Sequence, residues 1–162
     1  MAYLEMNGAM VLPITVSPDG ADFIAGWEDC RLIAYQDGGG VWTCGFGQTG
    51  PDICAGTFWT QEYAGQRFSE SLRKVVLGLR TYLHREATQQ QFDALCSLAF
   101  NCGVMAIGNS GLMARFNSGL DEECAIRFLL WNKDNGKIVD GLTKRRTAEM
   151  HLFANGDYSG RP

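Results

Sequence analysis

The residues best suited to chemistry are two acids and a threonine in the first third of the chain. Glu28 stands nine residues before Asp37, and Thr43 follows six residues after Asp37. Cleavage of a glycosidic bond needs one carboxyl group that keeps its proton near neutral pH, a second that stays ionised, and a group that places the attacking water. The three side chains could supply these functions, so they indicate glycoside hydrolysis as the candidate chemistry.

The elements around these residues would hold them at helix, turn and strand positions. A helix is expected from about residue 18 to 30, with Ser17 as its N-cap, and its end would present Glu28. Alternating residues from 32 to 46 surround Asp37 and three glycines, a pattern typical of a β-hairpin. Each of the three residues also has an ordinary interpretation, as a surface acid, a turn residue and a strand hydroxyl.

The remainder of the chain is predicted to be helical. Thr60 begins a helical region that reaches about residue 83, and Thr88 with Gln91 forms a capping box before the next helix. The other expected elements are short helices at about 110–117 and 121–131, a loop or small hairpin at 132–140, and a last helix at about 142–154 capped by Asp140.

These elements predict an α+β fold in one domain spanning residues 1–162. A small β-containing lobe at about 30–60 would be followed by a linking helix and a larger helical lobe at about 66–162, to which helix 18–30 is joined. Residues 1–16 form an N-terminal extension. The groove between the lobes is the expected place for a substrate.

Several short strings occur in a characteristic order along the chain. Gly45-Phe46-Gly47 follows Thr43, and further landmarks are Gln91-Phe92-Asp93-Ala94-Leu95, Ala99-Phe100-Asn101-Cys102-Gly103, Trp131, Gly141-Leu142, Arg145-Arg146 and Glu149. With the Glu28, Asp37 and Thr43 spacing, this order resembles the phage-type lysozymes, the phage T4 lysozyme-like endolysins of glycoside hydrolase family 24. The resemblance covers about residues 21–156 and implies a lysozyme-like fold.

The same resemblance implies the reaction. It is hydrolysis of the β-1,4 bond between N-acetylmuramic acid and N-acetylglucosamine in bacterial peptidoglycan, for host lysis and phage release. Glu28 would be the general acid, with Asp37 and Thr43 placing and activating water in an inverting mechanism. Apolar neighbours such as Trp27 would favour the protonated acid whereas Arg145 would favour the carboxylate, and the sequence leaves that balance open.

The resemblance also indicates which residues contact substrate: Gly47, Gln48, Thr49, Phe100, Asn101 and Arg145. Phe100 would face a sugar ring and Asn101 an acetamido group. Gln48 departs from the family, which often carries His there, and is expected to be supportive. Trp131, in an apolar run, is expected to belong to the core.

Two other functions remain open. One is a catalytically silent peptidoglycan-binding module, against which the intact Glu28, Asp37 and Thr43 argue. The other is a lytic transglycosylase, which cleaves the same bond with one essential acid and leaves an anhydro sugar.

Composition describes an ordinary globular chain. Charged residues make up 20% and hydrophobic residues 46% of 162 residues. The net charge of −4 argues against a nucleic-acid partner, and a monomer is expected. Binding to an anionic wall would need a local positive patch, for which the candidates are Arg127, Lys133, Lys137, Lys144, Arg145 and Arg146; a solvated helix face is the alternative.

Six cysteines are many for a chain of this length and allow 15 full pairings. Cys44 and Cys54 flank a turn-rich segment and are the first choice for a disulfide. Cys96 and Cys102 are expected to be free thiols at an apolar helix. There is no CxxC pair and the two histidines are far apart, so neither a metal site nor a cofactor is expected.

The N-terminus carries no legible export signal. The apolar run at residues 9–16 is interrupted by Pro13, is too short to span a membrane, and is preceded by Glu5 rather than a basic residue. Stable membrane insertion is therefore not expected. The expectation is synthesis in the host cytoplasm and action on the periplasmic wall after release through a holin-type lesion made by another protein.

Overall fold

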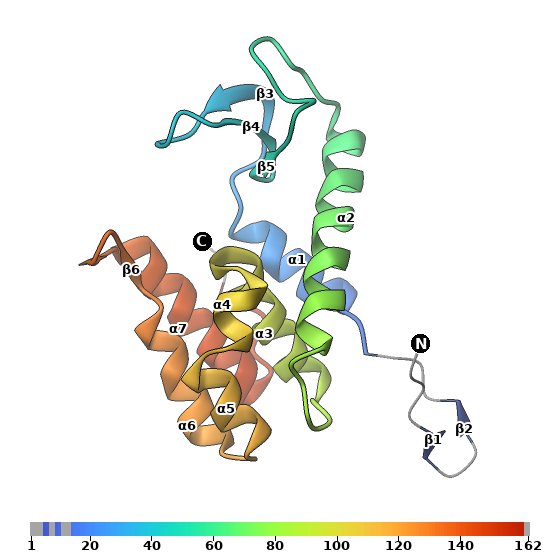
Figure 1. Ribbon diagram of the computed structural model, residues 1–162, viewed down its shortest axis with the longest axis vertical. Coiled ribbons are helices and arrows are strands. Elements are labelled where there is room, and N and C mark those ends of the chain that lie inside the picture. Colours follow the sequence, from blue (N-terminus) through green and yellow to red (C-terminus); the bar gives the residue numbers. More distant parts are fainter. Residues whose placement is uncertain (1–4, 7–8, 11–13, 161–162) are drawn as a thin grey trace.

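The computed structural model describes residues 5–6, 9–10 and 14–160, and it consists of a small β lobe and a larger helical lobe (Figure 1). The β lobe holds a three-stranded antiparallel sheet in the order β3 (Arg31–Gln36), β4 (Trp42–Gly45), β5 (Gln48–Thr49). The long helix α2 (Gln61–Arg80) extends from this lobe into the helical lobe. Near the N-terminus, β1 (Glu5–Met6) and β2 (Ala9–Met10) pair with each other; the rest of the apolar run at 9–16, apart from 14–16, lies outside the described residues.

The helical lobe is built around α3 (Gln89–Cys102), in which nine consecutive residues are buried. It packs against α7 (Asp140–Asn155), α1 (Pro18–Gly26) and α2. The remaining elements are α4 (Val104–Gly108), α5 (Gly111–Asn117), α6 (Asp121–Arg127), the 3-10 helix η1 (Phe128–Leu130) and the hairpin β6 (Lys133–Asp134), β7 (Lys137–Ile138). The loop-or-hairpin alternative at 132–140 is thus resolved as a hairpin.

Three predicted N-caps are confirmed. The side chains of Ser17, Thr60 and Thr88 accept hydrogen bonds from backbone N–H groups in the first turns of α1, α2 and α3. Both halves of the Thr88–Gln91 capping box are present. These signals were readable because a cap depends on residues only three positions apart.

Other boundaries differ from the prediction. Helix α1 ends at Gly26, so Glu28 lies in the turn that follows and not on the helix. Asp140 is the first residue of α7 rather than its cap. The expected helix at 121–131 tightens into a 3-10 turn at Phe128, and α4 was not predicted because its five residues are too few to show a period.

Two apolar clusters form the core. The larger one fills the helical lobe, and a smaller one beneath the sheet contains Cys44, Ile53, Trp59 and Ala64. Phe46 packs against both clusters. Its ring lies 5.0 Å from that of Phe68, which lies 5.5 Å from that of Phe100, so a row of aromatic rings links the lobes.

None of the helices in the described part of the chain combines the length and the apolar character needed to cross a bilayer.

Candidate active site

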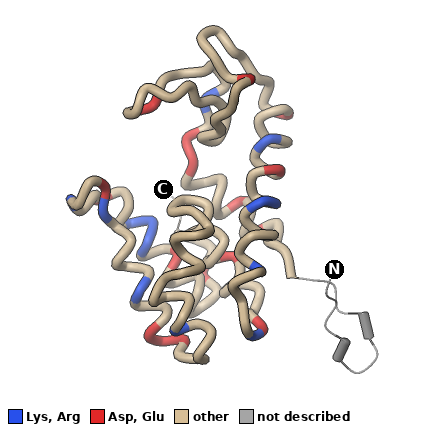
Figure 2. The backbone as a smooth tube through the Cα atoms, viewed as in Figure 1, with Lys and Arg blue, Asp and Glu red and all other residues tan. Residues whose placement is uncertain are grey.

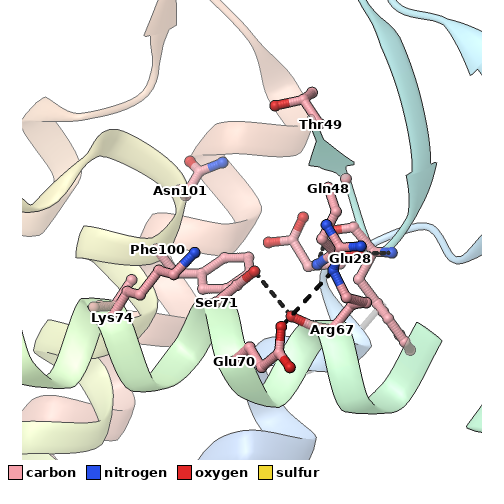
Figure 3. Close-up of a pocket in the computed structure, with 12 residues that line it drawn as sticks. Glu28, Gln48, Thr49, Arg67, Glu70, Ser71, Lys74, Phe100 and Asn101 are labelled. Carbon is pink, nitrogen blue, oxygen red and sulfur yellow. Dashed lines mark hydrogen bonds and ion pairs between the residues drawn. The ribbon is translucent and has the colours of Figure 1, made fainter. Parts of the chain in front are cut away.

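A cleft of about 430 Å³ lies between the two lobes (Figure 3). Its walls come from the turn after α1, the β4–β5 turn, α2 and the end of α3. Six residues singled out in the sequence line it: Glu28, Gly47, Gln48, Thr49, Phe100 and Asn101. Its size and its polar lining suit a sugar chain.

Glu28 is held in the cleft wall by a buried cation. Its Oε1 lies 2.8 Å from Nη1 of Arg145, and the two side chains are 18% and 5% exposed. Arg145 approaches from α7, more than a hundred residues away in sequence, as the resemblance implied. Because Arg145 is buried behind it, Glu28 has a fixed orientation but still reaches the cleft.

The β4–β5 turn brings a backbone edge to the cleft. Gly45 and Gly47 have positive φ, and a Cβ on Gly45 would lie 2.6 Å from Oε1 of Gln48. That oxygen accepts a hydrogen bond from the Phe46 backbone N–H at 2.8 Å. Gln48 therefore closes the turn through its side chain, and its role towards substrate stays a prediction.

Thr43 lies on the face of the sheet that carries Thr49. It pairs with Tyr35 on β3 and with Thr49 on β5, and side chains of paired residues share a face. Thr49 lines the cleft, although Thr43 itself, only 4% exposed, is not part of the lining. The Thr43 hydroxyl donates to the Val41 carbonyl at 3.1 Å, so its oxygen keeps lone pairs for a water.

Asp37 sits in the β3–β4 turn, outside the lining of the cleft. Its Oδ1 accepts hydrogen bonds from the backbone N–H groups of Gly39 and Val41, each at 2.9 Å. Asp37 therefore stabilises the β3–β4 turn, which is the ordinary interpretation of an aspartate at this place. It leaves Oδ2 without a hydrogen bond among the described residues, so the second oxygen is available for chemistry.

The α2 wall of the cleft was missed by sequence reasoning. Arg67, Glu70, Ser71 and Lys74 line it, and their spacing of three and four residues places them on one face of the helix. Acidic and basic residues alternate along this part of α2 (Figure 2). Arg67 is held by Asp52 at 2.5 Å and by the Trp59 ring. The signal was present as a polar stripe opposite the buried face, but such a stripe is usually a solvated surface.

Trp131 packs against the main core, as expected, and also lines a second cavity. That cavity adjoins the cleft through Asn101, which lines both.

The expected positive patch is only partly at the surface. Arg145 and Arg146 are 4% and 0% exposed, and both pair with Glu149. They are core residues whose two charges are balanced by Glu149 and Glu28. A surface patch at this place therefore has only four of the six proposed cations. No set of three His, Cys, Asp or Glu side chains is close enough to hold a metal ion within the described residues.

All six cysteines are free thiols in the structure, so the expected Cys44–Cys54 bridge is not formed. The Cys44 thiol is buried and donates to the backbone carbonyl groups of Arg31 and Leu32. Cys54 is exposed, near the Thr57 hydroxyl. Their different contacts explain why residues flanking one turn need not meet.

Thiol labelling should follow burial. Burial raises the pKa of Cys96 well above its ordinary value and that of Cys124 to about 12, so neither supplies thiolate near neutral pH. Exposed Cys54 is expected to react first with iodoacetamide in the folded protein, and all six in denaturant. Mass spectrometry of timed digests would check this order. Labelling of Cys96 as fast as Cys54 would contradict it.

Comparison with known proteins gives the family. The phage lysozyme family model matches residues 25–149. The endolysin of an Acyrthosiphon pisum secondary endosymbiont phage is 39% identical over 142 residues, covering 85% of this chain and 97% of that protein. The endolysin of Bacillus phage B103 is 34% identical over 146 residues, covering 89% of this chain; the chain spans only 56% of that protein's length.

A solved structure gives the fold. The endolysin from Escherichia coli O157:H7 phage FAHEc1 superposes with a TM-score of 0.82 at 32% identity, covering 90% of this chain and 96% of that one. The predicted α+β, lysozyme-like fold is confirmed. On the match of residues 25–149, the chain belongs to the phage lysozyme family.

Proposed function

We propose that this chain is an endolysin that hydrolyses the β-1,4 bond between N-acetylmuramic acid and N-acetylglucosamine in the bacterial cell wall. The observation that carries the proposal is the position of Glu28, which lies in the cleft between the lobes against the buried Arg145. Family membership and endolysin relatives support the substrate class.

The proposed chemistry divides the work between the two lobes. Glu28 protonates the leaving oxygen from the turn after α1. Asp37 and Thr43, on the β hairpin, activate and place the attacking water. Within the part of the chain that the structure describes, one oxygen of the Asp37 carboxylate accepts no hydrogen bond, and Thr43 lies on the sheet face shared with the cleft residue Thr49. Attack on the face opposite the leaving group gives inversion at the anomeric carbon.

The cleft lining supports a sugar substrate. Phe100 presents an aromatic surface and packs on Phe68, which fixes its ring. Gly47, Gln48 and Thr49 present backbone and polar groups from the opposite wall. Sugars are commonly held by this combination of an aromatic face with hydrogen-bonding groups, because each ring has both apolar and hydroxyl surfaces.

Digestion of purified cell-wall sacculi tests the function. The expected products are muropeptides with hydrated, reducing N-acetylmuramic acid ends, seen by mass spectrometry before and after borohydride reduction. Early ¹H NMR spectra should show the α-anomer of the new end, because the cleaved bond is β.

Each rival function has its own outcome in the same experiment. Anhydro ends would replace the proposal with transglycosylation, whereas retention of sacculi without products would replace it with binding alone. If the β-anomer forms first, the hydrolase function stands, but the inverting mechanism assigned to Asp37 and Thr43 is overturned.

A further inference from the structure

Behind the cleft, a buried carboxylate is connected through two arginines to Glu28 and Asn101, which both line the cleft. Glu149 on α7 is fully buried, together with Arg146 and, nearly so, Arg145. A buried charge is costly unless it is paired and hydrogen-bonded, so a cluster of this kind requires an explanation. The family landmarks mark these positions without giving Glu149 a role.

One arm of the cluster leads to Glu28. Oε1 of Glu149 accepts a hydrogen bond from Nε of Arg145 at 3.1 Å, and Nη1 of the same guanidinium lies 2.8 Å from Glu28. A guanidinium is planar and rigid, so fixing its Nε edge also fixes where Nη1 points. Glu149 thus determines the position of the cation beside Glu28.

The other arm leads to Asn101 in the cleft wall. Nε of Arg146 lies 2.8 Å from Oε2 of Glu149, and Nη2 donates both to Oε1 of Glu149 and to Oδ1 of Asn101, each at 3.1 Å. Arginine only donates, so Oδ1 of Asn101 must face Arg146. The Asn101 amide is therefore oriented by the same carboxylate, with its N–H groups left to meet a carbonyl oxygen of the ligand.

The carboxylate itself is anchored from α3. The Ser97 hydroxyl donates to Oε1 at 2.6 Å and is fully buried. Together with the two arginines, Ser97 gives Oε1 three donors. A group held so tightly has a single position, which suits a part that must orient others.

We propose that Glu149 is a positioning residue that orients Glu28 through Arg145 and the substrate-facing amide of Asn101 through Arg146. This rests on the proposed function, in which Glu28 is the acid. One buried carboxylate then fixes the positions of two groups relative to each other: the acid that protonates the leaving oxygen, and an amide that binds the sugar or its attached peptide.

The charges of the cluster give the proposal a specific pH dependence. Two arginines are balanced by Glu149 and Glu28. Cys102 of α3 is a further titratable neighbour of the cluster, because its sulfur accepts a hydrogen bond from Arg146. Among the described residues, α6 and η1 contribute no ion pair or side-chain hydrogen bond to Glu149. Burial raises the pKa of Glu149, while Arg146, Arg145 and Ser97 oppose that rise. Loss of the Glu149 charge would leave Arg145 stabilising the ionised form of Glu28 more strongly.

Glu149→Gln keeps the shape of the side chain and removes its charge. On soluble peptidoglycan strands, kcat should fall roughly 10- to 100-fold at neutral pH, because small misplacements of reacting groups cost this much. The alkaline limb of the pH–kcat profile should move down by about one pH unit, because the acid loses its proton earlier. KM should rise as Asn101 loses its fixed orientation.

Two comparisons make the test decisive. Glu123 is a glutamate of the same lobe whose ion-pair partner is Arg115 rather than a residue of the cluster. Glu123→Gln should therefore leave kcat, KM and the pH profile unchanged. Glu149→Asp keeps the charge but is one methylene short of reaching both arginines. It should restore the position of the alkaline limb without restoring full kcat.

A folded Glu149→Gln protein with a uniform loss of activity, and the wild-type alkaline limb and KM, would overturn the proposal by showing a merely structural role. Failure of both Glu149 variants to fold would also overturn it, since the proposal requires the fold to survive loss of this charge. Neither result affects the proposed function, which depends on the products that the wild-type protein releases from sacculi.

Discussion

Glu28→Gln should lower the rate of wall hydrolysis by roughly 10²- to 10⁴-fold while the protein stays folded, because general acid catalysis contributes about this much. Glutamine keeps the size of glutamate and still presents an oxygen to Arg145, whose Nη1 lies 2.8 Å from Oε1 of Glu28. It cannot deliver an acidic proton to the leaving oxygen. The loss should therefore appear in kcat, with substrate binding largely retained.

The measurement combines clearing of purified sacculi with far-UV circular dichroism and a melting curve. Glu62→Gln is a matched control, because Glu62 is an exposed residue of α2 outside the cleft lining. It should clear sacculi like the wild-type protein. If a folded Glu28→Gln protein clears them at the wild-type rate, Glu28 is not the acid.

What the sequence could predict depended on how local each interaction is. Ser17 and Thr88 cap helices through groups three residues away, and both were identified correctly. Glu28 was expected at the end of a helix, but α1 stops at Gly26 and the acid lies in the following turn. The turn still leaves it in the cleft, because the position of an active residue depends on the path of the chain more than on its secondary structure.

The parts of the site that escaped prediction depend on contacts between distant residues. The run Lys144-Arg145-Arg146 looks like a solvated basic surface. Two of its members turn inward only because Glu149 lies three and four residues further on and Glu28 meets Arg145 from another element. Nothing in the local pattern indicates that the partner of Arg145 lies more than a hundred residues earlier; the expectation that Arg145 lies beside Glu28 came from the family resemblance alone.

The cysteines show the same limit, here through a contact that was predicted from the sequence and is not formed. Spacing suggested Cys44 and Cys54 as a pair, but the buried Cys44 thiol is directed to carbonyl groups of β3. A disulfide requires the two Cβ atoms to approach within about 4.5 Å in a suitable orientation, which sequence separation alone does not determine.

Asp93→Ala should lower the free energy of unfolding by roughly 3 to 5 kcal/mol, because it leaves several donors without their charged acceptor. Asp93 on α3 is fully buried. It accepts hydrogen bonds from the Ser17 backbone N–H at 3.0 Å, the Ser17 hydroxyl at 2.5 Å, Gln89 at 2.9 Å and Tyr158 at 2.7 Å. It therefore fixes both the N-cap of α1 and the C-terminal segment.

The fit around Asp93 leaves no room for a side chain at position 20. A Cβ on Gly20, in the first turn of α1, would lie 2.4 Å from Cγ of Asp93, so the helix can approach the carboxylate only with glycine there. The partial positive charge at the N-terminus of α1 adds to the attraction. The same carboxylate, with burial as the larger cause, raises the pKa of Tyr158 to about 12.

Thermal unfolding measures the effect. For a chain of this size, the loss in Asp93→Ala corresponds to a fall in Tm of roughly 6 to 20 °C. Tyr158→Phe removes only one of the hydrogen bonds and should cost about 1 kcal/mol. Because Asp93 does not line the cleft, the variant should still hydrolyse sacculi at temperatures where it is folded. A Tm within 2 °C of wild type, about the smallest shift that 1 kcal/mol would give, would mean that Ser17 and Tyr158 find other partners and that α1 is held by its apolar face alone.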